Sequence, residues 1–420
     1  MEVIIYTLRT VSTALLDSLN LLMLIMIGIM FYFSNKKISI IQKMTIGESL
    51  DSPLELTLSQ IVLGIVIGAV GSLILFILGI TFNENSGIEI ILMITVLGLF
   101  YKQRFIKIPY TGALLGLVSI ILLQLNKYID TKIYINLDIE NMVILVGIMY
   151  LLEGLLIIID GDKGAIPVFT NKDDRIIGGF SFNRMWPLPI ALLILFNEST
   201  LGVSEFISPN WWPLLNNSKI LSVIATGVLI GMPFYAMSGY TSVTFTKNKK
   251  RKKIESGAIR IIYGGSLIVV SYIATLGFVG QIITLAYMSL IYELIIKFEM
   301  KNELEGKSLY VSDDEGITIL EVAPSSPAYK AGIRRGDKVI SVNNQNVQSE
   351  IDILKIAKDS IFEIAIKIKK EKGSIVEYLI RPKNKRLGIL LVPKFTDEKI
   401  IKVNPNEIKK IIEDLKNKKE

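Results

Sequence analysis

The residues "VAPSSPAYKAGIRRGDKVISVNN", Val322 to Asn344, hold a dense series of turn and cap signals between two apolar runs. Either serine of the Ser-Ser-Pro step can cap a helix that has Pro327 in its first turn. Gly332 stands where this short helix must end in a left-handed conformation. A Gly-Asp turn at 336–337 precedes the next apolar strand. The run therefore predicts a strand, a short helix and a second strand of a small α+β domain.

The flanking segments extend this pattern. "GITILEV" at 316–322 alternates in the manner of a half-buried strand, and "SEIDILKIAK" at 349–358 reads as a second helix. "FEIAIKIKK" and "IVEYLIRP" follow as closing strands. The assembled pattern resembles a bacterial PDZ domain. That resemblance implies binding of an extended peptide as an added strand, with a loop of backbone amides receiving the terminal carboxylate.

The resemblance suggests two places for the peptide groove. The first lies between the strand "SLYV" at 308–311 and the helix at 349–358, with the carboxylate loop at 304–308. Its predicted peptide-binding residues are Gly306, Lys307, Ser308, Leu309, Tyr310, Val311, Ile351, Leu354 and Lys358. The second arises because bacterial PDZ domains can be circularly permuted, and it uses the run "RLGIL", with Leu387, Gly388 and Ile389 as the carboxylate loop. Ile351 and Leu354 are equally well explained as core residues.

The chain contains no histidine and no cysteine. A zinc protease of the HExxH kind needs two imidazoles, and a Ser-His-Asp protease needs a base that titrates near neutrality. Thiol catalysis, disulfides and iron-sulfur clusters need cysteine. Asp160 and Asp162 lie at the end of an apolar run, without the Gly-x-Gly-Asp pattern of an intramembrane aspartyl protease. We therefore expect a protein that is not an enzyme, with no catalytic residue, metal or cofactor.

The rest of the chain is apolar enough to lie in a membrane, because hydrophobic residues make up 51% and the mean hydropathy is +0.49. We expect a polytopic α-helical domain over 1–300 with about seven to nine transmembrane helices. A PDZ domain over 301–395 and a charged amphipathic tail helix over 396–420 should follow. The candidate spans are 11–33, 57–82, 88–101, 109–125, 142–160, 186–199, 218–240, 258–275 and 277–297.

Basic residues concentrate in alternate loops, at 34–56, 102–108, 161–185 and 241–257. The positive-inside rule places these loops and the PDZ domain in the cytoplasm, and the N-terminus outside if all the spans are real. The same rule accounts for the net charge of +7 better than nucleic-acid binding does.

Two acidic residues fall within apolar spans, Glu153 and Asp17. For Glu153 we expect a structural partner such as Arg184 or a tyrosine, and Asp17 should be interfacial. Arg184 and Trp186 are expected to anchor a helix at the interface, with Pro187 and Pro189 at its start.

Many membrane helices followed by a cytoplasmic PDZ domain, without protease residues, resemble the MinJ family of cell-division topology factors. The supporting motifs are "SPAYKAGIRRGDKVISVNN" and, less specifically, "GGFSFNRMWPLP" with "YLLEGLL" before it. The resemblance implies a scaffold at poles and septum that links DivIVA to MinD. Two alternatives remain: an inactive protease-like adaptor that presents substrates, and a transporter with a regulatory PDZ domain. The peptide bound and the oligomeric state are not predicted.

Overall fold

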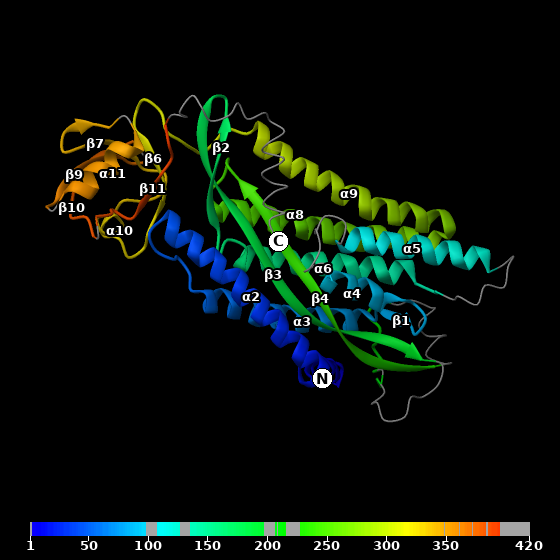
Figure 1. The fold of residues 1–420 in the computed structure, drawn as a ribbon. Coiled ribbons are helices and arrows are strands. Elements are labelled where there is room, and N and C mark those ends of the chain that lie inside the picture. Colours follow the sequence, from blue (N-terminus) through cyan, green and yellow to red (C-terminus); the bar gives the residue numbers. More distant parts are fainter. Residues whose placement is uncertain are drawn as a thin grey trace.

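The computed structural model forms an elongated apolar part with a small mixed α/β domain at one end (Figure 1). The residues that it describes are 2–97, 107–126, 135–196, 206–207, 209–215, 227–347, 349–360, 362–371, 373–383 and 385–394. The predicted tail helix at 396–420 lies outside these residues.

Within the described ranges, six helices are long and apolar enough to cross a membrane, judged by length and composition. They are α2 (Ser18–Thr45), α3 (Pro53–Leu78), α5 (Ile108–Leu125), α6 (Ile139–Asp160), α8 (Lys249–Ser271, continued by the 3-10 helix η1, Tyr272–Leu276) and α9 (Phe278–Glu305). Two further helices, α1 (Glu2–Leu16) and α4 (Ile88–Leu97), are shorter. The predicted helical membrane domain is confirmed, with somewhat fewer spanning helices than seven to nine.

Two of the predicted spans, 186–199 and 218–240, are wrong as helices. Their described residues belong to β3 (Arg175–Phe196) and β4 (Val228–Thr244), which pair antiparallel from Phe180–Thr244 to Phe196–Val228 and cross the helical part together (Figure 1). For 186–199 the physical reason is length, because about 14 residues reach only about 21 Å as a helix but about 46 Å as a strand. The span 218–240 is long enough for a helix, and its residues from Val228 on instead pair with β3.

Two short strands pair with the other edge of β3 near its two ends, and a third pairs with β3 on the same edge as β4. β2 (Ile166–Lys172) is antiparallel to its start and β1 (Thr81–Asn83) is parallel to its last residues, whereas β5 (Tyr310–Val311) joins at Ile177 and Gly178 on the edge of β4. Between β2 and β1 the other edge has no strand partner in the described chain. An open sheet edge is not tolerated in lipid, so another element has to cover it.

Helix α3 covers this edge and supplies hydrogen bonds to it. The Gln60 amide Nε2 donates to the carbonyl of Met185 at 2.9 Å, and the backbone N–H of Ala191 donates to Ser72 Oγ at 2.8 Å. These two polar side chains therefore take the role that a neighbouring strand would have.

Between those two hydrogen bonds the strand carries Pro187 and Pro189, which have no N–H to satisfy. Their carbonyls lie against Gly64 and Gly68 of α3, where an added Cβ would stand 2.1 and 2.4 Å from the respective oxygen atoms. The prolines suit an edge without a partner strand, and the glycines let the helix backbone approach it. The prediction that these prolines begin a helix is wrong for this reason.

The C-terminal domain has the predicted α+β pattern. Its sheet has the order β10-β9-β7-β6-β11, with β8 beside β7. The strands are β6 (Ile317–Val322), β7 (Lys338–Val342), β8 (Gln345–Asn346), β9 (Ile364–Lys369), β10 (Ile375–Ile380) and β11 (Ile389–Leu391). The helices are α10 (Pro327–Lys330) and α11 (Glu350–Asp359).

The turn chemistry of the opening segment is as predicted. Ser326 caps α10, because its Oγ accepts the N–H of Tyr329 at 3.1 Å, and Gly332 follows with φ +98°. The two asparagines at 343–344 both have positive φ in the turn after β7. The polar composition that begins at Lys301 falls inside α9, which runs to Glu305.

Candidate peptide-binding site and its junction with the membrane part

The first predicted groove, at Gly306 to Val311, is wrong. Strand β5 already pairs with β3 of the membrane part, and Tyr310 is only 3% exposed, with its ring edge-on to Phe180. The connecting residues are engaged too: Gly306 O accepts Lys172 Nζ at 2.7 Å, and the N–H of Leu309 donates to Phe245 O at 2.9 Å. Lys307 and Ser308 lie between these contacts. This segment ties the two parts together, and one edge of its strand is already taken by β3.

The second prediction falls on an edge of the C-terminal sheet. β11 is the terminal strand and pairs with β6, so its outer edge has no strand partner among the described residues. The loop before it contains Lys385 at φ +60° and Gly388 at φ +75°. Left-handed residues of this kind gather successive N–H groups into concavities that bind anions. Leu387 and Ile389 are buried on either side of the glycine.

Helix α11 contributes to the same hydrophobic core as this strand and carries exposed apolar side chains on its outer face. Ile353 and Ala357 pack in the domain core, whereas Ile351 and Leu354 are 53% and 54% exposed. The core interpretation of these two side chains is therefore wrong. Lys358 lies on the same exposed face, seven residues after Ile351. An open strand edge and an exposed apolar helix face on one small domain are the elements that strand-addition recognition uses.

Arg184 and Trp186 are not interfacial anchors, because both side chains are fully buried. The guanidinium Nε of Arg184 and the indole N–H of Trp186 each donate to Asp160 Oδ2 at 3.0 Å, and Lys163 lies 3.3 Å from Oδ1. Arg184 also donates to Ser59 Oγ at 2.7 Å. A buried charge is tolerated when it is paired and hydrogen-bonded in this way.

Glu153 has a different partner from the arginine that the sequence suggested. Its carboxylate accepts the hydroxyl of Ser238 on β4 at 2.9 Å and lies 3.6 Å from Arg260 Nε on α8. Arg260 also donates to Glu299 on α9 at 3.1 Å. The sequence reasoning missed Arg260, although a single arginine within an apolar span is a visible signal. Asp17 is exposed and caps α2.

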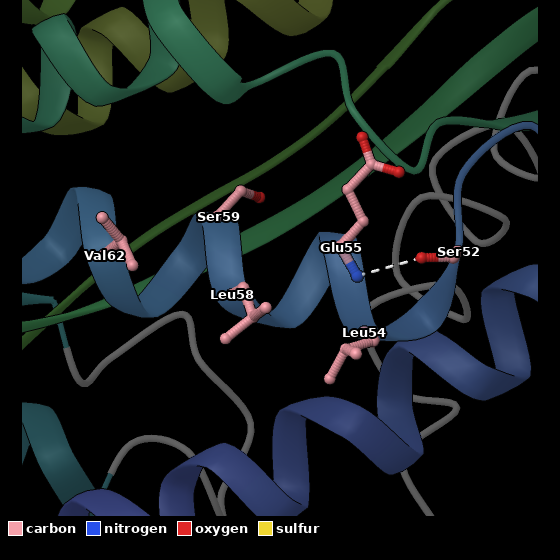
Figure 2. A pocket seen from close by; sticks show the side chains of 6 residues that line it. All are labelled: Ser52, Leu54, Glu55, Leu58, Ser59 and Val62. Carbon is pink, nitrogen blue, oxygen red and sulfur yellow. Dashed lines mark hydrogen bonds between the residues drawn. The ribbon is translucent and has the colours of Figure 1, made fainter.

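A hollow of about 460 Å³ lies on the first half of α3 (Figure 2). Its lining is Ser52, Leu54, Glu55, Leu58, Ser59 and Val62. The three apolar side chains are at least half exposed, and Glu55 is oriented differently from them (Figure 2). This surface has the character of a helix face that contacts lipid chains, and it brings together no pair of titratable groups for catalysis.

The PDZ-like domain is docked on the start of β3. Leu320 and Val392 belong to the same hydrophobic core as Phe180, and a Cβ on Gly178 would stand 3.0 Å from both. The absence of a side chain at Gly178 therefore lets the domain seat closely against the strand.

An ion-pair cluster surrounds this contact. Glu321 on β6 is bound by Lys249 at 2.7 Å and by Arg335 at 2.6 Å, and both cations lie about 5 Å from the centroid of the Phe180 ring. Burial acts to raise the pKa of Glu321, but Lys249 and Arg335 together hold that pKa below its usual value.

The basic run "KNKKRKK" has a structural role that the sequence did not show. Its lysines pair with acidic residues on several different elements, through the contacts Lys247–Glu255, Lys249–Glu321, Lys252–Glu303 and Lys253–Asp162. Lys250 and Arg251 are exposed. The run therefore fastens α8 to α6, α9 and the C-terminal domain, in addition to marking one side of the membrane.

Both the C-terminal domain and a large part of the chain are similar in sequence to known proteins. The PDZ domain family matches residues 318–368. A probable periplasmic serine endoprotease, DegP-like, of Rhizobium meliloti is 39% identical over 66 residues, which is 15% of this chain and 13% of the protease. Probable cell division topological determinants MinJ of Lacticaseibacillus paracasei and of Lacticaseibacillus casei are each 21% identical over 300 residues, or 69% of this chain and 72% of theirs. The chain is therefore a distant, MinJ-like homologue of these determinants, and it carries a PDZ domain near its C-terminal end.

Proposed function

We propose that the chain is a multi-pass membrane scaffold without enzymatic activity, whose PDZ domain lies in the cytoplasm and recruits partners by strand addition at β11. The observation that carries this proposal is the open edge of β11 on a domain that also exposes an apolar face of α11 and is docked to the membrane part. The scaffold acts in division-site selection at poles and septum, bridging a DivIVA-like to a MinD-like protein. The support for that part is the similarity to MinJ.

The groove can be tested with matched variants. Leu354→Lys places a charge on the exposed apolar face of α11, whereas Leu379→Lys makes the same change at a 69% exposed site on β10, the opposite edge of the sheet. The full-length protein is used as bait on detergent-solubilised membranes, and the captured proteins are identified by mass spectrometry. We expect Leu354→Lys to lose partners that the wild type and Leu379→Lys retain. Equal capture by all three proteins would refute the groove assignment.

The orientation can be tested because the chain has no native cysteine. Lys250→Cys introduces a thiol at an exposed site beside the PDZ domain, and Leu214→Cys introduces one at an exposed site beside the last turn of α3. In intact cells, a maleimide that does not cross membranes should label Leu214→Cys and leave Lys250→Cys unlabelled. The reverse pattern would place the PDZ domain outside.

The division role has its own test. A fluorescent fusion should concentrate at poles and septum, and deletion of the gene should misplace division sites. Uniform membrane fluorescence together with normal division would contradict this part of the proposal and leave the peptide groove untouched.

A further inference from the structure

The membrane part reaches the PDZ domain at a second place, through the loop at 46–52 between α2 and α3. The backbone N–H of Ser325 donates to Glu48 Oε1 at 2.8 Å, and the hydroxyl of Ser325 donates to Oε2 of the same carboxylate. Both oxygen atoms of Glu48 are thus occupied by one residue of the loop that leads into α10. Hydrogen bonds to a charged acceptor are among the stronger ones in proteins.

The segment that Glu48 holds also supports the candidate carboxylate loop. The N–H of Ala323 donates to Gly388 O at 2.8 Å, and Ser326 packs so closely on Gly388 that an added Cβ there would stand 2.3 Å from the Ser326 Cβ. Residues 323–326 therefore lie between Glu48 on one side and the loop before β11 on the other. Movement of this segment would move Gly388 with it.

The loop before β11 also approaches the membrane part directly. A Cβ built on Gly47 would stand 3.6 Å from Nη1 of Arg386, two residues before Gly388. Docking does not close the groove, because Ile351 and Leu354 stay about half exposed in the docked arrangement. The docked domain is consequently open to a ligand, with its carboxylate loop held from two sides.

We propose that Glu48 of the membrane part is a positioning residue for the carboxylate-receiving loop of the PDZ domain, so that the full peptide site exists only when the domain is docked. This inference rests on the proposed peptide groove. A loop that is already ordered binds its ligand without the cost of ordering it. Because coupling between two binding events is reciprocal, a bound peptide must also strengthen docking on the membrane part.

The experiment uses the full-length protein in lipid nanodiscs. Octapeptides with a free C-terminus are first selected on the wild type from a peptide library, and the best one is also made as its C-terminal amide. Affinities for both forms are measured by fluorescence anisotropy for the wild type, Glu48→Ala, Glu48→Gln and Ser325→Ala. Glu55→Gln is the matched control, because it removes a carboxylate from the first turn of α3 without touching the PDZ domain.

We expect Glu48→Ala to weaken the free-acid peptide about five- to tenfold, or about 1.0 to 1.4 kcal/mol, and to leave the amide nearly unchanged. Glu48→Gln keeps an acceptor for the Ser325 N–H and should recover part of the loss, while Glu55→Gln should match the wild type. Equal weakening of both peptides would show a merely structural role and overturn the proposal. Tighter binding by Glu48→Gln would also overturn it, because repulsion between carboxylates would then dominate. If the library yields no peptide on the wild type, the groove itself is refuted.

Discussion

The contact between α3 and β3 predicts the effect of adding one methyl group. Gly64→Ala would place a Cβ 2.1 Å from the carbonyl oxygen of Pro187, whereas ordinary contact begins at 3.4 Å. Helix and strand must therefore separate by roughly 1 Å, which lengthens the flanking hydrogen bonds of Gln60 and Ser72, now 2.9 and 2.8 Å. Each such bond contributes about 1 kcal/mol, and overpacking costs about 1–3 kcal/mol.

Alanine is more favourable than glycine within a helix by about 0.5–1 kcal/mol, which offsets part of these costs. We therefore expect Gly64→Ala to lower the free energy of unfolding by about 2–4 kcal/mol in total. Gly265→Ala on α8 is the control, because no atom lies within 4 Å of its added Cβ. That variant should be as stable as the wild type or slightly more stable. The assay is unfolding of the purified protein in detergent, followed by tryptophan fluorescence. Equal stability of Gly64→Ala and Gly265→Ala would refute the close packing of α3 on the strand.

Three further outcomes follow from the contacts at the other sites. Asp160→Asn should destabilise the protein by about 3–5 kcal/mol in the same unfolding assay, because it leaves the buried Arg184 unpaired. The double variant Asp160→Asn/Arg184→Met should recover part of the lost stability, because it removes the unpaired charge as well. In the folded protein the pKa of Glu321 is held below its usual value. The contribution of Glu321 to docking is therefore fully present above its unfolded-state pKa, and it is lost as the pH falls through its folded-state pKa. Energy transfer between fluorophores on the two parts should therefore drop at acidic pH, and Glu321→Gln should show a smaller pH-dependent change. Gly388→Ala combines φ +75° with a clash on the Ser326 side chain and should abolish peptide binding, measured by anisotropy; unaltered binding would exclude the β11 loop.

The PDZ segment was predictable because its signals are local. Caps such as Ser326 and glycines with positive φ such as Gly332 depend on the backbone within a few residues. The groove was harder, because the choice between 308–311 and the β11 loop depends on which strand is already paired. Tyr310 is buried against Phe180, about 130 residues away in the sequence, and no local pattern reports such a contact.

The two membrane strands were missed because hydropathy measures apolar length and not secondary structure. The clue was present in the run at 186–199, which is short for a helix and contains Pro187 and Pro189. The partners of the buried charges were missed for a related reason: Asp160 reads as a helix end in the sequence, and only the position of β3 brings Arg184 and Trp186 to it.

The long ribbon of β3 and β4 also sets how the protein meets its bilayer. A membrane helix adapts to a thicker or thinner bilayer by tilting, at a modest cost per ångström of mismatch. A strand paired along its length cannot slide by one residue without turning every side chain to the opposite face. Because α3 is bonded to β3 at Gln60 and Ser72, that helix cannot tilt independently either. The molecule therefore has a set hydrophobic thickness, and the surrounding lipid must adjust to it.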